Sequence, residues 1–454
     1  MTFTAKRRTA AVAGGLGLAL ALTACGASSD SGGTGTDVSD ADFDCAPYEQ
    51  FGELDGEEVE VYTGIVAPED QPFIDSWAPF EECTGIEITY NGSKEFEAQL
   101  LVRAQSGNAP DLAFVPQPGL LQSVVRNTGA AVPAPQAVSD NLDANWSEDW
   151  RAYGSVDGTL YGAPLGANIK SLVWYSPTAF EDAGYEVPTT WDEMIALSDQ
   201  IVEDGAKPWC QGFGSGEATG WPGTDWLEDV MLRTAGPEAY DQWVSHAIPF
   251  NDPQVAEALA TAGTILKNSD YVNAGLGEVN SIASTVWSDG TLPVEEGTCW
   301  MSKQGSFMQA NWSADIGEDS DIYAFVLPPI DPAMGEGVVG GGEFVTAFND
   351  RPATQAVQAL LSSAEWANLK AQATGPGWST ANTGLDPENL ESPIDQLVAE
   401  TFQNPETTFR FDASDLMPSQ VGSGAEWTEL TNWVANDKSD QDVLNAIESA
   451  WPAS

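Results

Sequence analysis

Tryptophan is the residue type whose number and placement most suggest a binding site in this chain. The sequence contains 17 tryptophans. Several lie beside glycine, proline or polar residues rather than within apolar stripes, namely Trp221, Trp287, Trp300, Trp378 and Trp427. Core packing is the more frequent role of any single tryptophan. Several in such settings together favour a site made of flat rings, which suits a carbohydrate because a sugar has apolar C–H faces and a rim of hydroxyl groups.

The hydroxyl rim of a sugar also needs fixed amide and carboxylate groups. Gln117, Asp225 and Glu343 could supply them beside Trp221 and Trp287.

Residues that could catalyse a reaction are few. His246 is the only histidine, and its surroundings, WVSHAIPFND, are typical of a helix end rather than of a Ser-His-Asp or Cys-His site. The sequence contains no HExxH, GxSxG or GxxxxGK motif and no proper GxGxxG motif, and the glycine-rich stretch GFGSGEATG lacks the lysine of a phosphate-binding loop. Two carboxylates could act as glycosidase acid and base, but among 69 acidic residues such a pair carries no weight.

The segment 210–237 contains two tryptophans, and its glycines at 212, 214, 216 and 220 let the backbone turn without side chains in the way. Cys210 could fasten its start, and we expect Thr224 to cap the helix that follows. Trp221 is then predicted to face a cleft as a stacking platform. Trp226, one turn into the helix, is predicted to pack inward.

Strands and helices that could position these residues alternate in the first part of the chain. The patterns predict strands at 58–64, 86–90 and 111–119 and helices at 71–85, 94–108 and 120–129. This rhythm predicts an α/β lobe with a mainly parallel sheet. Ligands of such sheets bind at the loops that leave the carboxyl ends of the strands.

A second series of elements begins with a long extended stretch at 160–177, long enough to cross between two lobes. The helix at 188–205 has a capping box formed by Thr190 and Glu193. The later patterns predict helices at 225–236, 252–268, 353–373 and from Glu426 onward, and extended segments at 299–312, 322–331 and 343–349.

The first 24 residues have the pattern of a secretion signal. Basic residues at 6–8 precede an apolar run at 10–22 that is too short for a membrane span. The run ends in Leu-Thr-Ala-Cys, which resembles the bacterial lipobox, so we expect Cys25 to become the lipidated N-terminus. A plain secreted protein cut near Ala24 is the alternative. Residues 26–44, rich in Gly, Ser, Thr and Asp, are predicted to form a flexible tether.

The remaining four cysteines are an even number in an exported chain, which favours disulfides over metal or redox chemistry. Three pairings are possible. We favour Cys45–Cys83, which would join the start of the folded region to the end of the first helix, and Cys210–Cys299, which would tie two later loops.

The formal net charge is −53, from 16 basic and 69 acidic residues. Such a field repels nucleic acid, anionic lipid and anionic solutes, and it favours a neutral or a cationic ligand. Solubility outside the cell is an alternative explanation of the charge, and acidity alone identifies no ligand. About 400 residues remain after the tether, which exceeds what one core usually supports and predicts two lobes.

Motifs over nearly the whole chain resemble those of the extracellular solute-binding lipoproteins that serve ABC sugar importers, and within that family the alpha-glucoside-binding type. The motifs are the lipobox, GSKEFEAQL (92–100), GNAPDLAFVPQPGLL (107–121), IKSLVWYSP (169–177), PTTWDEM (188–194), KPWCQGFGSGEATGWPGTDWLEDVMLRTAG (207–236), PFNDP (249–253), CWMSKQGSF (299–307) and FRFDASDLMP (409–418).

The resemblance implies an α/β, two-lobe periplasmic-binding-protein-like fold of type II, with two α/β sheets joined by a hinge and the ligand cleft between them. It implies a signal peptide at 1–24, a tether and disulfide segment at 25–55, one lobe from 56–168 plus 349–402, and a second from 169–348 plus 403–454. The lobes would close over the ligand like a hinged trap.

Matching motif to motif, the resemblance implies which residues line the cleft: Gln117, Asn168, Lys170, Trp221, Asp225, Trp287, Phe307, Glu343, Trp378 and Arg410. For Arg410 and Asp412, ion pairing at the hinge is an equally good interpretation.

The predicted function is that of a non-enzymatic receptor, monomeric and lipid-anchored to the outer face of the cell membrane. It would capture a neutral alpha-glucoside di- or oligosaccharide and deliver it to the permease subunits of an ABC transporter, without cofactor, metal or nucleic acid. A secreted glycoside hydrolase and a receptor for a cationic osmolyte or polyamine, whose ammonium tryptophans could enclose, are the alternatives.

Overall fold

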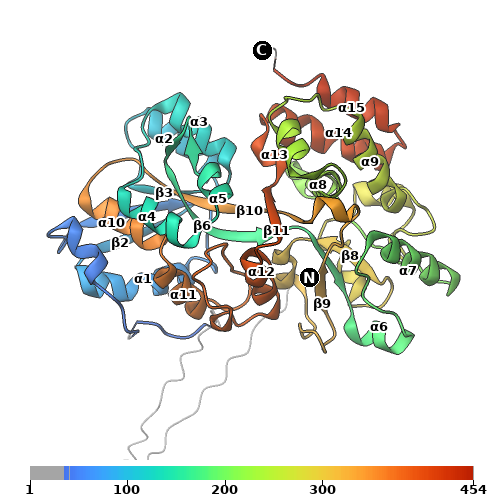
Figure 1. Ribbon diagram of the computed structural model, residues 1–454, viewed down its shortest axis with the longest axis horizontal. Coiled ribbons are helices and arrows are strands. Elements are labelled where there is room, and N and C mark those ends of the chain that lie inside the picture. Colours follow the sequence, from blue (N-terminus) through green and yellow to red (C-terminus); the bar gives the residue numbers. More distant parts are fainter. Residues whose placement is uncertain (1–34, 40, 453–454) are drawn as a thin grey trace, which may run out of the picture. The chain divides into compact units, whose positions relative to one another are not determined.

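Two β-sheets organise the residues that the computed structural model describes, 35–39 and 41–452 (Figure 1). The predicted signal peptide, the predicted lipidation site Cys25 and the first part of the predicted tether lie outside the described residues. Within those residues, no helix has both the length and the apolar character needed to cross a membrane.

The larger sheet has six strands, which are β1 (Glu58–Thr63), β2 (Glu87–Gly92), β3 (Leu112–Val115), β6 (Gly162–Ile169), β10 (Glu336–Ala347) and β11 (Thr407–Phe411). β1 runs parallel to both β2 and β3, as the sequence predicts. β10 is antiparallel to β3 and to β6, because it returns into the first lobe from the second. The sheet is therefore mixed rather than uniformly parallel.

The helices around this sheet include all those predicted and two, α4 (Gln136–Asn145) and α5 (Glu148–Tyr153), that were not. The others are α1 (Gln71–Thr84), α2 (Phe96–Gln105), α3 (Pro118–Thr128), α10 (Pro352–Leu361) and α11 (Ala364–Ala373). In α1 the stripe of Phe73, Trp77 and Phe80 is buried against the sheet. The helix ends at Gly85, whose φ of 73° is the left-handed conformation that glycine adopts most easily.

One predicted helix is divided. The segment 353–373 forms α10 and α11, because Ser363 accepts a hydrogen bond from the backbone N–H of Trp366 and so caps a new helix.

The second lobe contains a smaller sheet, in which β7 (Leu172–Tyr175) lies between β8 (Met301–Gln304) and β9 (Tyr323–Val326), all antiparallel. Its helices are α6 (Pro177–Ala183), α7 (Trp191–Glu203), α8 (Trp221–Val244), α9 (Pro253–Leu266), α13 (Ala413–Leu416), α14 (Trp427–Ala435) and α15 (Asp440–Glu448). In α7, Thr190 accepts from the N–H of Glu193, as the capping box predicts. The Glu193 carboxylate, however, reaches back to the N–H of Thr189.

The start of α8 differs from the prediction. The helix begins at Trp221, directly after Gly220 with its φ of 117°, and Pro222 occupies the first turn, where proline is well tolerated. Thr224 therefore lies inside the helix, and its hydroxyl donates to the Trp221 carbonyl at 2.8 Å. Trp226 is buried, as predicted, with 1% of its surface exposed.

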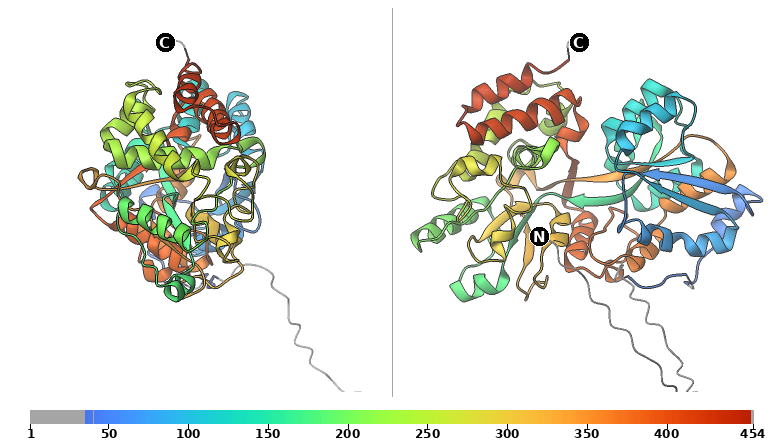
Figure 2. Two further views of the ribbon diagram at one scale, coloured as in Figure 1. Left: turned by 90° about the vertical axis from the view of Figure 1, so that its right-hand side faces the viewer. Right: turned by 180° about the vertical axis from the view of Figure 1, so that it is seen from behind.

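Three strands pass between the lobes. β6 leads into β7 through Lys170 and Ser171, β10 extends across the gap, and β11 pairs in parallel with the N-terminal part of β10 (Figure 2). A further link comes from α12 (Pro393–Gln403), because the Asp395 carboxylate accepts a hydrogen bond from the Gln309 amide at 2.7 Å. The residue boundaries of the two lobes stay a prediction.

Both favoured disulfides are present. Cys45 is bonded to Cys83 at the end of α1, and Cys210 is bonded to Cys299 in the second lobe.

The described end of the predicted tether contacts the first lobe. The N–H of Thr36 donates to the Gln372 carbonyl at 2.8 Å, and Val38 is buried against Leu369 and Ala373. Ala41 and Phe43 pack against the same cluster, so the few apolar residues of this polar segment hold it on α11.

Candidate functional site

A cavity of about 620 Å³ opens between β6, β10, the N-terminal end of α1 and the 3₁₀ turn η5 (Ser306–Asn311). Four residues predicted for the site line it, namely Asn168, Phe307, Glu343 and Trp378. Its wall therefore combines aromatic rings with an amide and a carboxylate. Phe307 comes from η5, which follows β8 of the smaller sheet, whereas Asn168 and Glu343 lie on β6 and β10 of the larger sheet and Trp378 lies in the loop after α11. In the larger sheet, Glu343 thus lies beside β6 and not in the second lobe, where the predicted boundaries place it.

Strand geometry explains how Glu343 reaches the cavity. The pairing of β10 with β6 shifts register between Gly342 and Phe344, and such an irregularity re-aims the side chain within it. Beneath that carboxylate, β6 carries Gly166, where a Cβ would lie 2.7 Å from Glu343 Oε2 and 3.1 Å from Trp378 Nε1. Glycine is thus required at this position to let both polar groups approach the strand.

Two polar atoms of the cavity are buried without a protein partner in the described part of the chain. They are the amide oxygen Oδ1 of Asn168, an acceptor, and the indole Nε1 of Trp378, a donor. Burying a polar group without a hydrogen bond costs free energy, and most buried groups in proteins are paired. The cavity wall therefore contains one acceptor and one donor whose hydrogen bonds no described residue supplies.

Lys370 lines the same cavity and was not predicted for the site. It extends from α11, has only 1% of its surface exposed, and donates to the Thr374 hydroxyl at 2.5 Å. Burial lowers its pKa to about 7, although Glu343 and neighbouring acids act in the opposite direction. In the sequence, Lys370 is a single lysine in an amphipathic helix, a pattern that predicts an exposed surface residue and not a binding-site residue.

Asp395 is the second cavity residue missing from the prediction. Its carboxylate accepts hydrogen bonds from the Gly377 N–H at 2.8 Å and from the Gln309 amide. Burial nevertheless raises its pKa to about 6. In the sequence it is simply an acid in the first turn of a helix, which is a common stabilising feature.

The predicted tryptophans of the second lobe adjoin the cavity through Phe307. The rings of Trp221, Trp287 and Phe307 form a triad with centroid separations of 5.7, 5.8 and 5.7 Å. Phe307 is the member that also lines the cavity. Trp221 and Trp287 therefore support the aromatic wall from behind or extend it.

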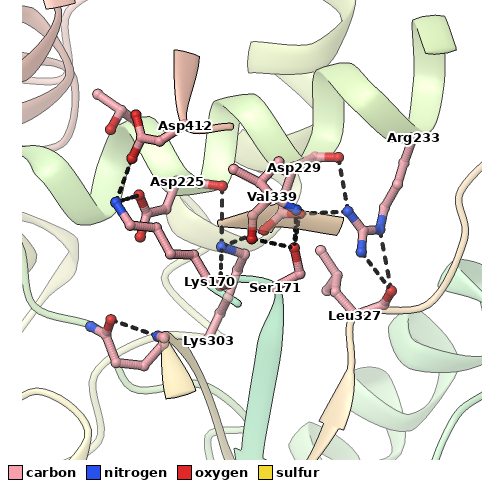
Figure 3. A network of polar contacts seen from close by, with 12 residues as sticks. Lys170, Ser171, Asp225, Asp229, Arg233, Lys303, Leu327, Val339 and Asp412 are labelled. Atoms are coloured by element: carbon pink, nitrogen blue, oxygen red, sulfur yellow. Dashed lines mark hydrogen bonds and ion pairs between the residues drawn. The ribbon is translucent and has the colours of Figure 1, made fainter. Parts of the chain in front are cut away.

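Lys170 and Asp225 lie next to this triad and are paired with each other at 3.2 Å (Figure 3). The Lys170 ammonium also donates to Asp412 and lies 5.3 Å from the centroid of the Trp221 ring. Burial raises the pKa of Asp225 to about 7, with Lys170 opposing that shift. The network continues through Lys303 of β8 to Asp229 and Arg233 of α8.

Gln117 and Arg410 lie elsewhere. Gln117 lines a separate depression of about 480 Å³, between α3 and the segment 414–419. Arg410 forms ion pairs with Asp241 at 2.7 Å and with Asp149 at 3.2 Å, and so joins α8 to α5. It does not line the cavity, and its contacts match the alternative interpretation of pairing at the hinge.

His246 is also remote from the cavity. Its Nε2 lies 3.1 Å from both oxygens of Glu448, and its ring stacks on Trp451 at 4.0 Å. It follows α8, the helix end that the sequence indicates.

The family profile described as bacterial extracellular solute-binding protein matches residues 60–374. The chain belongs to this family. It is 38% identical over 404 residues to the osmoprotective compounds-binding protein GgtB of Synechocystis, covering 88% of this chain and 94% of that one. It is 36% identical over 439 residues to the alpha-glucosides-binding periplasmic protein AglE of Rhizobium meliloti, covering 91% of each.

Solved structures of solute receptors share the fold. The receptor AcbH, described as preferring β-D-galactopyranose, superposes with a TM-score of 0.73 at 18% identity, covering 88% of this chain and 98% of that one. The cyclic alpha-maltosyl-1,6-maltose binding protein of Arthrobacter globiformis gives 0.63 at 22% identity, covering 87% and 97%.

This solute-binding protein therefore has the predicted two-lobe, type II architecture and serves an ABC importer of sugars or similar solutes. Its relatives are binding proteins rather than enzymes, which sets the glycoside hydrolase alternative aside.

Proposed function

We propose that this protein captures a neutral alpha-glucoside, a di- or oligosaccharide, in the cavity lined by Phe307 and Trp378. The observation that carries the proposal is the pair of buried, unpartnered polar atoms, Asn168 Oδ1 and Trp378 Nε1, beside aromatic rings. A sugar hydroxyl both donates and accepts, so adjacent hydroxyls could satisfy both atoms while the C–H faces pack on the rings.

Cations of the protein itself favour a neutral ligand over a cationic one. The Lys370 ammonium lies 4.2 Å from the centroid of Phe73 and 4.9 Å from that of Trp378, and Lys170 covers Trp221. An aromatic cage binds an ammonium ligand through open ring faces. Since lysines already occupy faces of these rings, a choline-like or polyamine ligand would meet like charge instead of a cage.

The names of the two relatives support overlapping ligand classes. AglE is named for alpha-glucosides and GgtB for osmoprotective compounds, and a small neutral glucoside can belong to both groups. We propose the alpha-glucoside class because the cavity provides hydrogen-bonding groups for hydroxyls next to apolar faces.

Delivery would depend on closure of the two lobes. A ligand that contacts Phe307 of one lobe and Trp378 of the other is held by both only when they approach, so binding shifts the population toward the closed form. The permease subunits of the importer would recognise that form. In this proposal the protein is a monomer held at the outer face of the membrane by a lipid on Cys25.

Titration calorimetry with a panel of solutes tests the ligand class. We expect maltose, sucrose or trehalose to give a saturable heat, and choline and putrescine to give none at the same concentrations. Saturable binding of choline or putrescine, with no response to any glucoside, would contradict the proposal.

Replacing Trp378 by Phe tests the observation that carries the proposal. Phenylalanine keeps an aromatic face but removes the indole N–H, so one hydrogen bond to the ligand is lost. We expect the dissociation constant for the best glucoside to rise about 5- to 15-fold, which corresponds to about 1–1.5 kcal/mol. The matched control is Trp451→Phe, remote from the cavity, which should bind as tightly as the native chain.

A further inference from the structure

Four carboxylates lie together in the second lobe, behind the aromatic triad. Asp225 and Glu228 extend from α8, Asp412 follows β11, and Glu426 ends η8 (Gln420–Glu426), a π-helical turn before α14. Each has at most 2% of its surface exposed. Oxygen atoms of Asp225, Glu228 and Asp412 lie within 4.8 Å of one another.

The positive charge available to this cluster is small. Lys170 pairs with Asp225 and Asp412, whereas Lys303 forms its ion pair with Asp229 at 2.6 Å. Asp415 is a fifth acid nearby, and its charge also acts on Lys170. Lys303 also donates to the Asp225 carbonyl at 3.1 Å, so among the described residues two ammonium groups are near these carboxylates and only Lys170 forms ion pairs with them.

Three oxygen atoms of the cluster have no hydrogen-bond partner among the described residues. They are Oε2 of Glu228 and both carboxylate oxygens of Glu426. The other oxygen of Glu228 accepts from the Ser414 N–H at 3.1 Å. Glu426 is close enough for its charge to act on Glu228, as those of Asp412 and Asp225 do, but it lies outside the group of three acids whose oxygen atoms are within 4.8 Å of one another. An isolated buried carboxylate is strongly unfavourable, and it must be protonated or neutralised by a cation.

The backbone that presents Glu426 is unusual. π-Helical turns are rare and occur frequently at functional sites. This one packs tightly on α13, because a Cβ at Gly422 would lie only 2.0 Å from the Ser414 carbonyl oxygen. The chain therefore uses a glycine and an irregular turn to bring a fully buried acid to three others.

We propose that Asp225, Glu228 and Asp412 bind a calcium ion, with the buried carboxylate of Glu426 adding negative charge beside it. The donor set consists of carboxylate oxygens only, without histidine or cysteine, which is the chemistry of a hard cation. Calcium fits better than magnesium because it accepts several carboxylates in irregular geometry, whereas magnesium tends to keep its own water. Lys170 stays on the side of the cluster that faces Trp221.

Calcium in this position would join α8 to the segment after β11, beside η8. It would also hold the Lys170 side chain beside the aromatic triad. The ion would be structural, and no sugar is needed to detect it. The proposal is therefore independent of the ligand class proposed above.

Thermal unfolding of the mature chain, stripped with EDTA and titrated with CaCl₂ in the absence of sugar, tests the site. We expect the melting temperature to rise saturably, by roughly 2–5 °C at a hundredfold excess over the dissociation constant, with about one calcium per chain by elemental analysis. Glu426→Gln and Glu228→Gln should each lose most of the rise. Glu296→Gln, which removes the same charge from an exposed position, should keep it.

A chain with this many acids can also bind calcium loosely over its surface. A rise that survives in both Glu426→Gln and Glu228→Gln would assign the effect to that surface and overturn the proposal. The proposal would equally fail if CaCl₂ up to 10 mM left the native chain unchanged while the two glutamine variants melted higher. That result would show that protons neutralise the cluster. If Glu228→Gln does not fold because it disturbs Ser414, Glu426→Gln decides the outcome.

Discussion

Lys370 controls the electrostatics of the cavity. Its ammonium is buried beside aromatic rings and donates to the Thr374 hydroxyl, so the charged form is maintained at a cost. Desolvation also raises the pKa values of Glu343 and Asp395. Desolvation thus disfavours the charged form of all three groups, which reduces the charge that the cavity presents to a ligand.

Stability should reveal the burial of Lys370. Its folded-state pKa of about 7 lies below the ordinary value of 10.5, so between these values the unfolded chain binds a proton that the folded chain does not. The free energy of unfolding contributed by this group consequently rises with pH from about 7 toward 10. Lys370→Met should melt higher than the native chain at pH 6.5, and the difference should shrink by pH 9.5.

A scan of melting temperatures against pH measures that difference directly. Lys94→Met, at an exposed position, serves as the control because it removes the same charge without a buried site. A difference for Lys370→Met that stays constant from pH 6.5 to 9.5 would mean that the lysine does not change its protonation there.

At the scale of elements, the cavity depends on how β6 and β10 pair, because a glycine or a register shift leaves space for side chains of the neighbouring strand. Gly166 of β6 lies beneath the Glu343 carboxylate and the Trp378 indole, and the irregular pairing beside Gly342 turns Glu343 toward them. The site is thus an outcome of strand pairing as much as of the residues that face the ligand.

Gly166→Ala tests this arrangement. The added methyl would meet Glu343 Oε2 at 2.7 Å and Trp378 Nε1 at 3.1 Å, so both groups must move. We expect at least about tenfold weaker glucoside binding, about 1.4 kcal/mol, with a smaller change in the urea midpoint because the Glu343 carboxylate is at the end of a flexible chain. Gly317→Ala, which would contact only Ser320 in a loop, is the control. If Gly166→Ala binds the glucoside as tightly as the native chain, Glu343 and Trp378 do not contribute to binding.

Local sequence patterns predicted most elements correctly. The stripe of Phe73, Trp77 and Phe80 in α1 and the capping residue Thr190 in α7 act over a few positions, so periodicity and capping rules find them. The predicted start of α8 was wrong, because Pro222 allows the helix to begin at Trp221, before the position that Thr224 indicates. The sequence analysis predicted one helix at 353–373 and not two, because it did not identify Ser363 as the cap of a second helix.

The site was predictable only where a residue lay in a distinctive motif. Asn168, Phe307, Glu343 and Trp378 meet in the cavity, although they are up to 210 positions apart. Lys370 and Asp395 could not be found, because their burial results from packing between distant helices. Arg410 shows the converse limit, since a charged residue in a matching motif forms ion pairs away from the cavity.

The molecule as a whole carries a formal charge of −53, and mutual repulsion of its acids opposes the compact state. Most of these acids cannot be paired, because only 16 basic residues exist. Salt shortens the range of the repulsion from about 30 Å at 0.01 M to about 3 Å at 1 M.

Raising NaCl from 0.01 to 1 M should therefore raise the melting temperature by several degrees, with most of the change below about 0.3 M, where screening changes fastest. The measurement needs EDTA throughout, so that traces of calcium do not contribute. A melting temperature that falls or stays level over this range would mean that the ion pairs lost to screening outweigh the repulsion relieved.

If Cys25 carries the proposed lipid, the contact of α11 with the segment around Val38 would limit the distance between the receptor and the membrane. Thr36 is bonded to the Gln372 carbonyl, so an anchor at Cys25 would be joined to the folded body by about 11 residues. At no more than about 3.6 Å per residue, this part of the tether spans at most about 40 Å. The receptor would then stay within roughly one body length of the bilayer, and each molecule would meet only nearby transporters instead of diffusing away with its cargo.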